Sequence, residues 1–307
     1  VAGHYLDGGN YPQGTSRRIA ETISNVIEKN GGTLAVNAGV QEVLTSKGTA
    51  VGVLMENGDK IKSNFVISGA GVANTYTKLM SENNKLIQSV DKKMKKVKRT
   101  GSYVCLHIGL NKSIQDMMIK NTNLWIYPGY DHDQSLKNYI DNPRSEFPLV
   151  YVSFPSAKDD SWDKNHPNSG TIEAIIPSQM SWYSNWHNTN WKKRGSEYDL
   201  HKEKLSKGIL EVVLKHVPEI KNSIDIHELS TPITVKSLAN YSNGEMYGLD
   251  HSPRRFRQRW LRTSSGMKNL FFTGQDVTTV GVSSALFSGL LTASAVLKKD
   301  LSILLRN

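Results

Sequence analysis

The sequence predicts an α/β (α+β) protein in which a region of antiparallel sheet and helix interrupts an α/β layer. Helical and strand-like segments alternate near both ends of the 307-residue chain. Between them, residues 102–176 hold apolar, β-branched segments separated by polar loops, a pattern typical of an antiparallel sheet. Residues 283–298 are apolar on nearly all sides, which predicts a buried helix. The length suffices for one large domain or two ordinary ones.

The N-terminal layer is expected to begin with a helix over residues 15–30. Apolar side chains recur there at helical spacing, Thr15 or Ser16 can cap its start, and Gly31-Gly32 ends it. Short strands are expected after it at 33–36, 39–44, 50–55 and 60–67. The last two of these strands are joined by Asn57-Gly58, a favoured hairpin turn pair.

The middle and C-terminal segments continue this pattern. Residues 72–99 are basic and predicted helical, and residues 197–216 form a second predicted helix that ends before Pro218. Strands are expected at 102–110, 124–128, 148–154, 171–176 and 270–273, with loops or short helices at 156–170 and 177–196 and a strand-like or irregular stretch at 224–242. Because the first and last pieces belong to one layer, the predicted domain segments are 1–75, 76–264 and 265–307.

The chain carries a net charge of +10, concentrated at 92–99 and 254–262. Solvated helix faces, an anionic membrane surface and a nucleic acid each explain such clusters. Nucleic acid is the weakest explanation and is not expected as a partner, because no base-reading module is present. No apolar run reaches the roughly 18 residues of a spanning helix. The aromatic residues inside 254–262 favour peripheral membrane contact, in a compartment that the sequence does not specify.

The single cysteine, Cys105, excludes an intramolecular disulfide. It lies in a predicted strand, which favours a buried structural thiol over a redox thiol. No metal site is expected. The nearest candidate, Asp131-His132-Asp133, is interpreted as a polar loop.

The most informative segment is 269–293. An apolar strand ends at Gly274, which lets a ligand approach the backbone, and Asp276 follows as an acceptor suited to hydroxyl groups. A turn then leads to Gly281-Val282-Ser283 at the start of a helix, where free N–H groups favour an electron-rich ligand. Gly289 and Ala293 are small enough for close packing against a cofactor or helix. Ordinary strand–turn–helix packing explains the same residues equally well.

This segment resembles the C-terminal flavin-binding motif of the phytoene-desaturase superfamily, and within it most closely that of the retinol saturases. The resemblance rests on Thr273-Gly274-Gln275-Asp276 followed by Gly281-Val282, Ala285-Leu286 and Ser288-Gly289. It implies an FAD cofactor contacted by Gly274, Gln275 and Asp276 at its ribityl–pyrophosphate part. The amides of Gly281, Val282 and Ser283 would face the pyrimidine edge of the ring system.

Other stretches carry the same resemblance. His4–Ser16 with Gly31-Gly32 is similar to a family block, although Thr15 stands where the family usually has Gly. The strand that begins near Val40 would meet the adenine through its backbone. Landmarks of the retinol saturases follow in order at 155–159, 182–183, 193–195 and 246–251. A Gly-x-Gly-x-x-Gly turn is absent from the sequence, so we expect that an N-terminal nucleotide-binding segment is missing and that this piece alone is inactive.

The resemblance implies hydride transfer between an apolar polyene, retinoid or carotenoid, and flavin N5, with NAD(P)H as a candidate electron donor. Tyr247 and His251 are candidates for supplying the proton or orienting the substrate, against a purely structural role for each. Candidate tunnel-lining aromatics are Trp125, Tyr127, Trp182, Tyr183 and Trp186. The alternatives are a carotenoid desaturase or cis–trans isomerase and, from another class, a basic membrane- or nucleic-acid-binding module without catalysis.

Overall fold

The computed structural model describes residues 6, 8–80 and 85–305. The chain divides into two compact units. The first unit consists of residues 1–8, 35–100 and 247–307, and the second of residues 9–34 and 101–246. The predicted segments 1–75, 76–264 and 265–307 stay a prediction. Within the first unit, the Thr100 amide donates to the Gly248 carbonyl and ties the segments 35–100 and 247–307 together.

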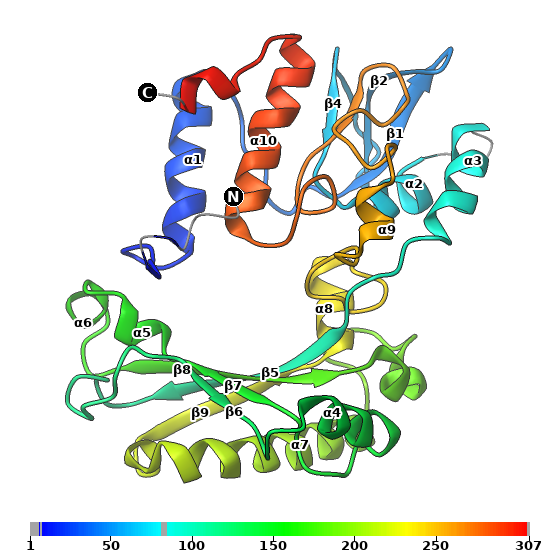
Figure 1. Ribbon diagram of the computed structural model, residues 1–307. Coiled ribbons are helices and arrows are strands. Elements are labelled where there is room, and N and C mark those ends of the chain that lie inside the picture. The colour runs from blue at the N-terminus through cyan, green and yellow to red at the C-terminus, as the bar shows by residue number, and fades with distance from the viewer. Residues whose placement is uncertain (1–5, 7, 81–84, 306–307) are drawn as a thin grey trace. The chain divides into compact units, whose positions relative to one another are not determined.

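The first unit contains two small sheets and several helices (Figure 1). The antiparallel sheet consists of β1 (Val40–Ser46), β2 (Thr49–Met55) and β3 (Lys60–Lys62), and the parallel pair of β4 (Val66–Ser68) and β10 (Leu270–Phe272). The helices are α2 (Val72–Lys78), α3 (Lys85–Met94), α9 (Pro253–Phe256), α10 (Val282–Leu297) and the 3₁₀ turn η3 (Ser302–Leu305).

Several predicted elements of the first unit are corrected. The residues of the expected strand 33–36 are irregular. The expected strand 60–67 is two strands in different sheets, because Ser63 Oγ donates to the Phe65 carbonyl at 2.6 Å and turns the chain between them. The expected helix 72–99 is likewise interrupted between α2 and α3. The Asn57-Gly58 hairpin is confirmed, with Gly58 at φ +91°.

Helix α10 does not bury its apolar side, so that prediction is wrong. Its buried residues are Ser284, Ser288 and Thr292, and apolar residues such as Leu286 are exposed. The polar residues lie at helical spacing on one face, where they make hydrogen bonds to β10 and to the turn that follows it. Thr292 Oγ1, for example, donates to the Phe272 carbonyl at 2.8 Å. Polar pairing with β10 therefore overrides the hydropathy pattern.

The second unit is built on an antiparallel sheet, as predicted, and its fifth strand lies in the stretch 224–242 that was expected to be strand-like or irregular. The strands are β5 (Ser102–Leu110), β6 (Leu124–Ile126), β7 (Val150–Ser153), β8 (Gly170–Ser178) and β9 (Ile224–Ser230), in the order β6-β7-β8-β5-β9. The helices are α1 (Arg17–Lys29), α4 (His132–Asp141), α5 (Pro155–Lys158), α6 (Trp162–Asn165), α7 (Ser196–His216) and α8 (Pro232–Ala239), with 3₁₀ turns η1 (Met180–Trp186) and η2 (Pro218–Ile220).

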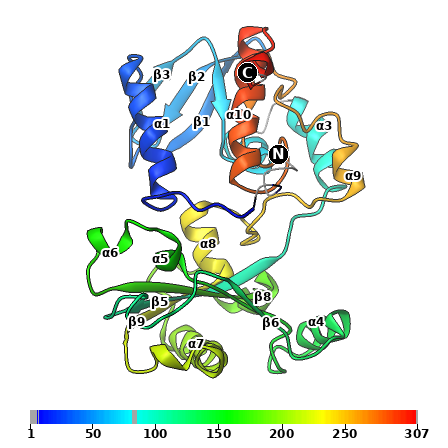
Figure 2. The ribbon, with the colours of Figure 1, turned by 60° about the vertical axis from the view of Figure 1, so that its left-hand side comes forward.

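Alternate residues of β5 decide which face of this sheet is the core. Val104, Leu106 and Ile108 are buried in one apolar cluster with Ile209 and Val213 of α7. Figures 1 and 2 show α7 running beneath the sheet. Because side chains alternate along a strand, the odd-numbered residues of β5 point to the opposite face.

Helix α8 lies inside the stretch expected to be strand-like or irregular. Thr231 begins the helix with a reciprocal cap to Thr234, and Pro232 occupies the first turn, where a missing N–H costs nothing. The Thr231-Pro232 pair indicates the start of a helix, whereas the β-branched residues of the segment favour a strand.

Candidate functional site

The turn after β10 is open on the side from which a ligand would approach. Gly274 has φ +100°, and a Cβ placed there would meet nothing within 4 Å. Its amide donates to Ser288 Oγ at 2.6 Å, and Thr273 Oγ1 lies 3.0 Å from the same oxygen. Ser288 of α10 therefore fixes the turn from behind and leaves the front of Gly274 free of side-chain atoms.

Asp276 connects three segments of the first unit. The residue is only 5% exposed, and its carboxylate accepts from the Val72 amide at 3.0 Å and from the Leu249 amide at 3.1 Å. Gly248 makes this approach possible, since it has φ +65° and a Cβ there would lie 2.4 Å from Asp276 Oδ1. Both carboxylate oxygens are thus engaged by the backbone, and direct contact with FAD stays a prediction.

Arg255 holds the same turn from the other side, although no feature of the sequence distinguishes it from the neighbouring arginines. The side chain is 2% exposed. Its guanidinium donates to the carbonyls of Gln275 at 3.0 Å, Asp276 at 2.7 Å and Thr278 at 2.6 Å. Arg255 belongs to the basic segment 254–262 in sequence, but its side chain is buried and holds the turn through hydrogen bonds.

The start of α10 presents backbone amides. Gly281 caps the helix with φ +99°, and a Cβ there would also meet nothing within 4 Å. The first amides of a helix have no partner within it and carry a partial positive charge. The predicted trio Gly281, Val282 and Ser283 therefore has the geometry to face an electron-rich group.

The two candidate catalytic residues lie in the same unit. His251 Nε2 accepts from the Val280 amide at 2.8 Å, so this nitrogen holds the turn before α10. Burial lowers the pKa of His251, and the nearby Arg255 charge lowers it further. Tyr247 is partly exposed, and its amide donates to Thr100 Oγ1 at 3.1 Å. The geometry favours a positioning role for His251, and the catalytic roles of both stay predictions.

Val40 is the first residue of β1 and pairs with Met55. It belongs to the first unit, as do the other predicted cofactor-binding residues Gly274, Gln275, Asp276, Gly281, Val282 and Ser283. The hydrogen bonds described above join the turn 274–281 to Leu249, His251 and α10. Val40 lies in the separate three-stranded sheet, and its contact with adenine stays a prediction.

The predicted tunnel aromatics separate into two groups. Tyr183 is fully buried, and Trp182 and Trp186 pack against the same apolar core, so these three are core residues of the second unit. Trp125 and Tyr127 are exposed instead. Cys105 is half-buried, and its Sγ lies 3.8 Å from His107 Nδ1, so it is not the buried thiol that was expected.

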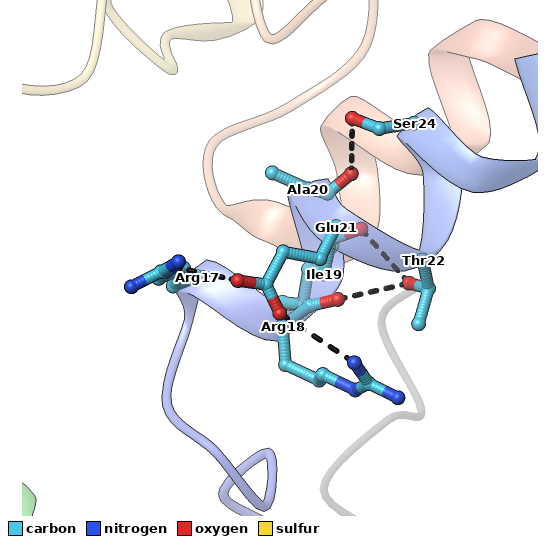
Figure 3. A network of polar contacts seen from close by, with 7 residues as sticks. All are labelled: Arg17, Arg18, Ile19, Ala20, Glu21, Thr22 and Ser24. Atoms are coloured by element: carbon cyan, nitrogen blue, oxygen red, sulfur yellow. Dashed lines mark hydrogen bonds and ion pairs between the residues drawn. The ribbon is translucent and has the colours of Figure 1, made fainter. Parts of the chain in front are cut away.

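A polar pocket of about 620 Å³ lies in the second unit at the start of α1. Its lining includes Arg17, Arg18, Glu21, Asp159 and His166. Figure 3 shows Glu21 between the two arginines, with ion-pair distances of 2.6 Å to Arg17 and 3.5 Å to Arg18. Because Glu21 already offsets much of the arginine charge, the pocket is a weak candidate for an anion.

The basic segment 254–262 is only partly a surface. Arg255 and Leu261 are buried, while Arg254, Phe256 and Arg257 are exposed. Peripheral membrane contact through it stays a prediction. Among the described residues, no helix combines the length and apolar character needed to cross a membrane. In the same part of the chain, His, Cys, Asp and Glu side chains form no group of three or more suited to a metal ion.

Comparison with known proteins places these features in context. No protein-family model matches the chain. It is 33% identical to the all-trans-retinol 13,14-reductase of Homo sapiens over 318 aligned positions, covering 100% of this chain and 52% of the relative. It is 30% identical to an inactive all-trans-retinol 13,14-reductase of Danio rerio (98% and 51%) and 23% identical to a phytoene desaturase of Neurospora crassa (94% and 48%). The chain therefore spans about half the length of these relatives.

The fold agrees with that relationship. Putrescine oxidase bound to putrescine superimposes with a TM-score of 0.58 at 14% identity, covering 94% of this chain and 54% of the oxidase. At this identity the likeness concerns the fold alone. The predicted α/β fold class and the resemblance to the retinol-saturase and phytoene-desaturase group are both confirmed.

Proposed function

We propose that this chain, a homologue of the all-trans-retinol 13,14-reductases and of the phytoene desaturases, forms part of a flavin-dependent oxidoreductase. The enzyme would act on the C=C or CH–CH bonds of an apolar polyene, in the manner of a retinol saturase. The observation that carries the proposal is the braced turn 274–281. Two glycines face open space there, while Asp276, Arg255 and Ser288 hold the backbone behind them.

The residues of the first unit fit FAD. Gly274 and Gly281 leave room for a large group to touch the backbone, because neither carries a Cβ and the space in front of each is open. When bound, the flavin supplies the N5 position that exchanges a hydride with the polyene. The amides of Gly281, Val282 and Ser283 would hydrogen-bond the electron-rich edge of the ring, and preorganised N–H donors of this kind stabilise developing negative charge.

The remaining roles follow from the same arrangement. Tyr247, whose side chain is partly exposed beside Gly248, would orient the substrate or deliver a proton to the carbon next to the one that receives hydride. His251 would hold the 279–281 turn through its bond to Val280. NAD(P)H is the proposed electron donor.

Product analysis on the full-length flavoprotein tests the proposal. The reduced enzyme is incubated without oxygen with all-trans-retinol or with a carotene, and the products are separated by chromatography. A dihydro product confirms saturation. Additional conjugation or an altered double-bond geometry would indicate a desaturase or an isomerase. Protein with full flavin occupancy that leaves every polyene unchanged would contradict the proposal.

Flavin binding tests the role of the turn 274–281 separately from turnover. Gly274→Val fills the open space in front of the turn, so bound FAD measured by absorbance is expected to fall at least tenfold. Gly195→Val is the matched control, since Gly195 also has a positive φ of +85° and faces open space but lies at the start of α7 in the second unit. Equal flavin content in both variants would remove the turn 274–281 from the binding site.

Membrane association is the least specific part of the proposal. The exposed arginines Arg254, Arg257 and Arg259 would contact anionic lipid, each contributing about 1 kcal/mol near the surface. Replacing all three by Gln, with the buried Arg255 unchanged, should reduce flotation with anionic liposomes. If the unsubstituted protein does not float with the liposomes, membrane association is contradicted. Steeply salt-dependent binding to nucleic acid, without flavin uptake, would favour the non-catalytic alternative.

A further inference from the structure

The sheet of the second unit has one face that α7 does not cover, and strand register orders its side chains into rows. Residues directly opposite each other on antiparallel strands point to the same face, with Cβ atoms about 5 Å apart. Cys105 on β5 pairs with Ile175 on β8, which pairs with Tyr151 on β7, which pairs with Trp125 on β6. These four residues form a largely apolar row across four strands.

The outer end of this row is aromatic and exposed. The Trp125 ring meets the Tyr151 ring edge-on, with centroids 4.7 Å apart, and Trp125 is 60% exposed. Three strand spacings separate Trp125 from Cys105, or about 14 Å at the usual 4.8 Å per strand. The row therefore offers a long, narrow apolar strip.

The inner end of the strip reaches polar groups. His107, two residues beyond Cys105 on β5, pairs in register with Glu173. His107 Nδ1 lies 3.5 Å from Glu173 Oε1, and His107 Nε2 lies 3.0 Å from Ser230 Oγ. The His107 and Glu173 side chains are 47% and 43% exposed, so both remain accessible to a ligand.

The charges around His107 fix its protonation state. Hydrogen bonds to the Cys105 thiol and to Glu173 raise the pKa of His107 to about 10, and His107 in turn lowers the pKa of Glu173. Lys158 faces Glu173 from α5, and its pKa is lowered by burial. Glu228 pairs with His107 from β9 and lies 3.9 Å from Lys202. The contact with the Glu173 carboxylate favours the protonated form of His107, whose Nε2 then donates to Ser230 Oγ.

We propose that His107, Glu173 and Ser230 bind the hydroxyl end of a polyene alcohol, whose hydrocarbon chain lies along the strip from Cys105 to Trp125. This inference rests on the proposed function and makes its substrate class more specific. With His107 donating to Ser230 Oγ, the Ser230 hydroxyl hydrogen can turn to the ligand oxygen. Glu173 then accepts the ligand's own O–H.

The same groups disfavour a pure hydrocarbon. A carotene without oxygen would cover the partly exposed carboxylate of Glu173 and the Ser230 hydroxyl without replacing the hydrogen bonds that they make to water. A site built for a hydroxyl rejects an analogue that lacks it for this reason. The cluster therefore favours a polyene alcohol over a polyene that carries no oxygen.

Ligand binding to the full-length flavoprotein tests the assignment without requiring turnover. Quenching of tryptophan fluorescence gives the affinity for all-trans-retinol and for a retinoid hydrocarbon that lacks the hydroxyl. His107→Gln and Ser230→Ala should each weaken retinol binding about tenfold, the effect of about one lost hydrogen bond. Their affinity for the hydrocarbon should not change. Trp125→Ala should weaken both ligands to the same extent.

His227→Gln is the matched control. His227 is an exposed histidine on β9 that pairs with Ile108 and so belongs to the opposite face, and retinol affinity should remain that of the wild type. Circular dichroism and the melting temperature establish that each variant is folded. Equal losses for retinol and hydrocarbon in His107→Gln, or no loss for either, would overturn the assignment. Retinol binding that follows the predicted pattern without any turnover would leave it intact and would count against the proposed reaction alone.

Discussion

The two units differ in which atoms they offer to a ligand. The first unit presents backbone, with glycines and helix amides in front and the buried Asp276, Arg255 and Ser288 behind. The second unit presents side chains, namely His107 and its partners, on a sheet face whose backbone bonds are satisfied by neighbouring strands. A backbone site depends on residues that never touch the ligand, whereas a side-chain site depends on residues that do.

This difference predicts two kinds of mutational effect. In the first unit, the most damaging substitutions should lower stability and flavin retention together, because the buried polar residues determine the shape of the turn. In the second unit, substitutions on the open sheet face should change ligand preference and leave stability nearly unchanged, because those side chains are half exposed.

The largest effect is expected for Asp276→Asn. An amide can accept one of the two backbone N–H bonds, but its NH₂ group would then face the second N–H donor in a buried site. The free energy of unfolding should fall by about 3 kcal/mol, and flavin should be lost. Asp116→Asn, at an exposed loop position of the second unit, is the control. Urea unfolding of both variants measures the difference, and an unchanged Asp276→Asn protein would remove the distinction between the units.

Arg255→Met should follow, with a loss of about 2 kcal/mol. The methionine fills part of the volume but leaves the carbonyls of Gln275, Asp276 and Thr278 without their donor. Arg254→Met removes the same charge from the neighbouring exposed position and should be nearly neutral. Thermal unfolding and flavin content compare the pair. Equal effects at the two positions would mean that the charge of the segment matters, and not the buried guanidinium.

The sequence singles out the open glycines of the first unit but not the residues that support them. Gly274 stands out because it follows a predicted strand, and Gly281 because it precedes a predicted helix. Arg255 could not be recognised, because five of the nine residues at 254–262 are arginines and only tertiary packing selects one for burial. Helix α10 was misjudged for a related reason. Its threonine Thr292 bonds to β10 and its buried serines bond to the following turn, partners that hydropathy does not reveal.

In the second unit, strand positions were predictable and the open-face cluster was not. The apolar, β-branched segments 102–110 and 171–176, bounded by polar loops, located the strands. The pairing of His107 with Glu173 depends on the register between β5 and β8, which are separated in sequence by two other strands. A shift by one residue would place each side chain on the other face. Composition and spacing within one strand carry no information about that register.

A smaller effect on stability is expected for the His107–Glu173 ion pair in the second unit. Folding raises the pKa of His107 to about 10, so the His107–Glu173 ion pair makes its full contribution to stability below the unfolded-state pKa of about 6.5. That contribution is lost as the pH rises through 10. His107→Gln should therefore reduce the unfolding free energy by less than about 1 kcal/mol at pH 6, with a smaller difference at pH 10.5. Denaturant unfolding at the two pH values measures it. A difference that grows with pH would contradict the assigned protonation.

The smallest effect concerns a strained backbone position. Thr15 has φ +67°, a left-handed conformation that a β-branched residue adopts at a cost. Thr15→Gly removes that strain but gives the unfolded chain more freedom, so a net gain of about 0.5 kcal/mol is expected.

Ser16→Gly is the opposite control, because Ser16 has φ −59° and gains nothing from glycine. The two melting temperatures should move in opposite directions. This pair extends the comparison between the units to the backbone itself. Beside Thr15, the Gly14 amide donates to the buried Asp159 carboxylate at 3.1 Å. This turn of the second unit is thus held by a buried carboxylate, just as the turn at Gly274 is held by the buried Ser288 hydroxyl. If Thr15→Gly destabilises the protein, the Thr15 side chain must contribute more to that turn than its backbone strain costs.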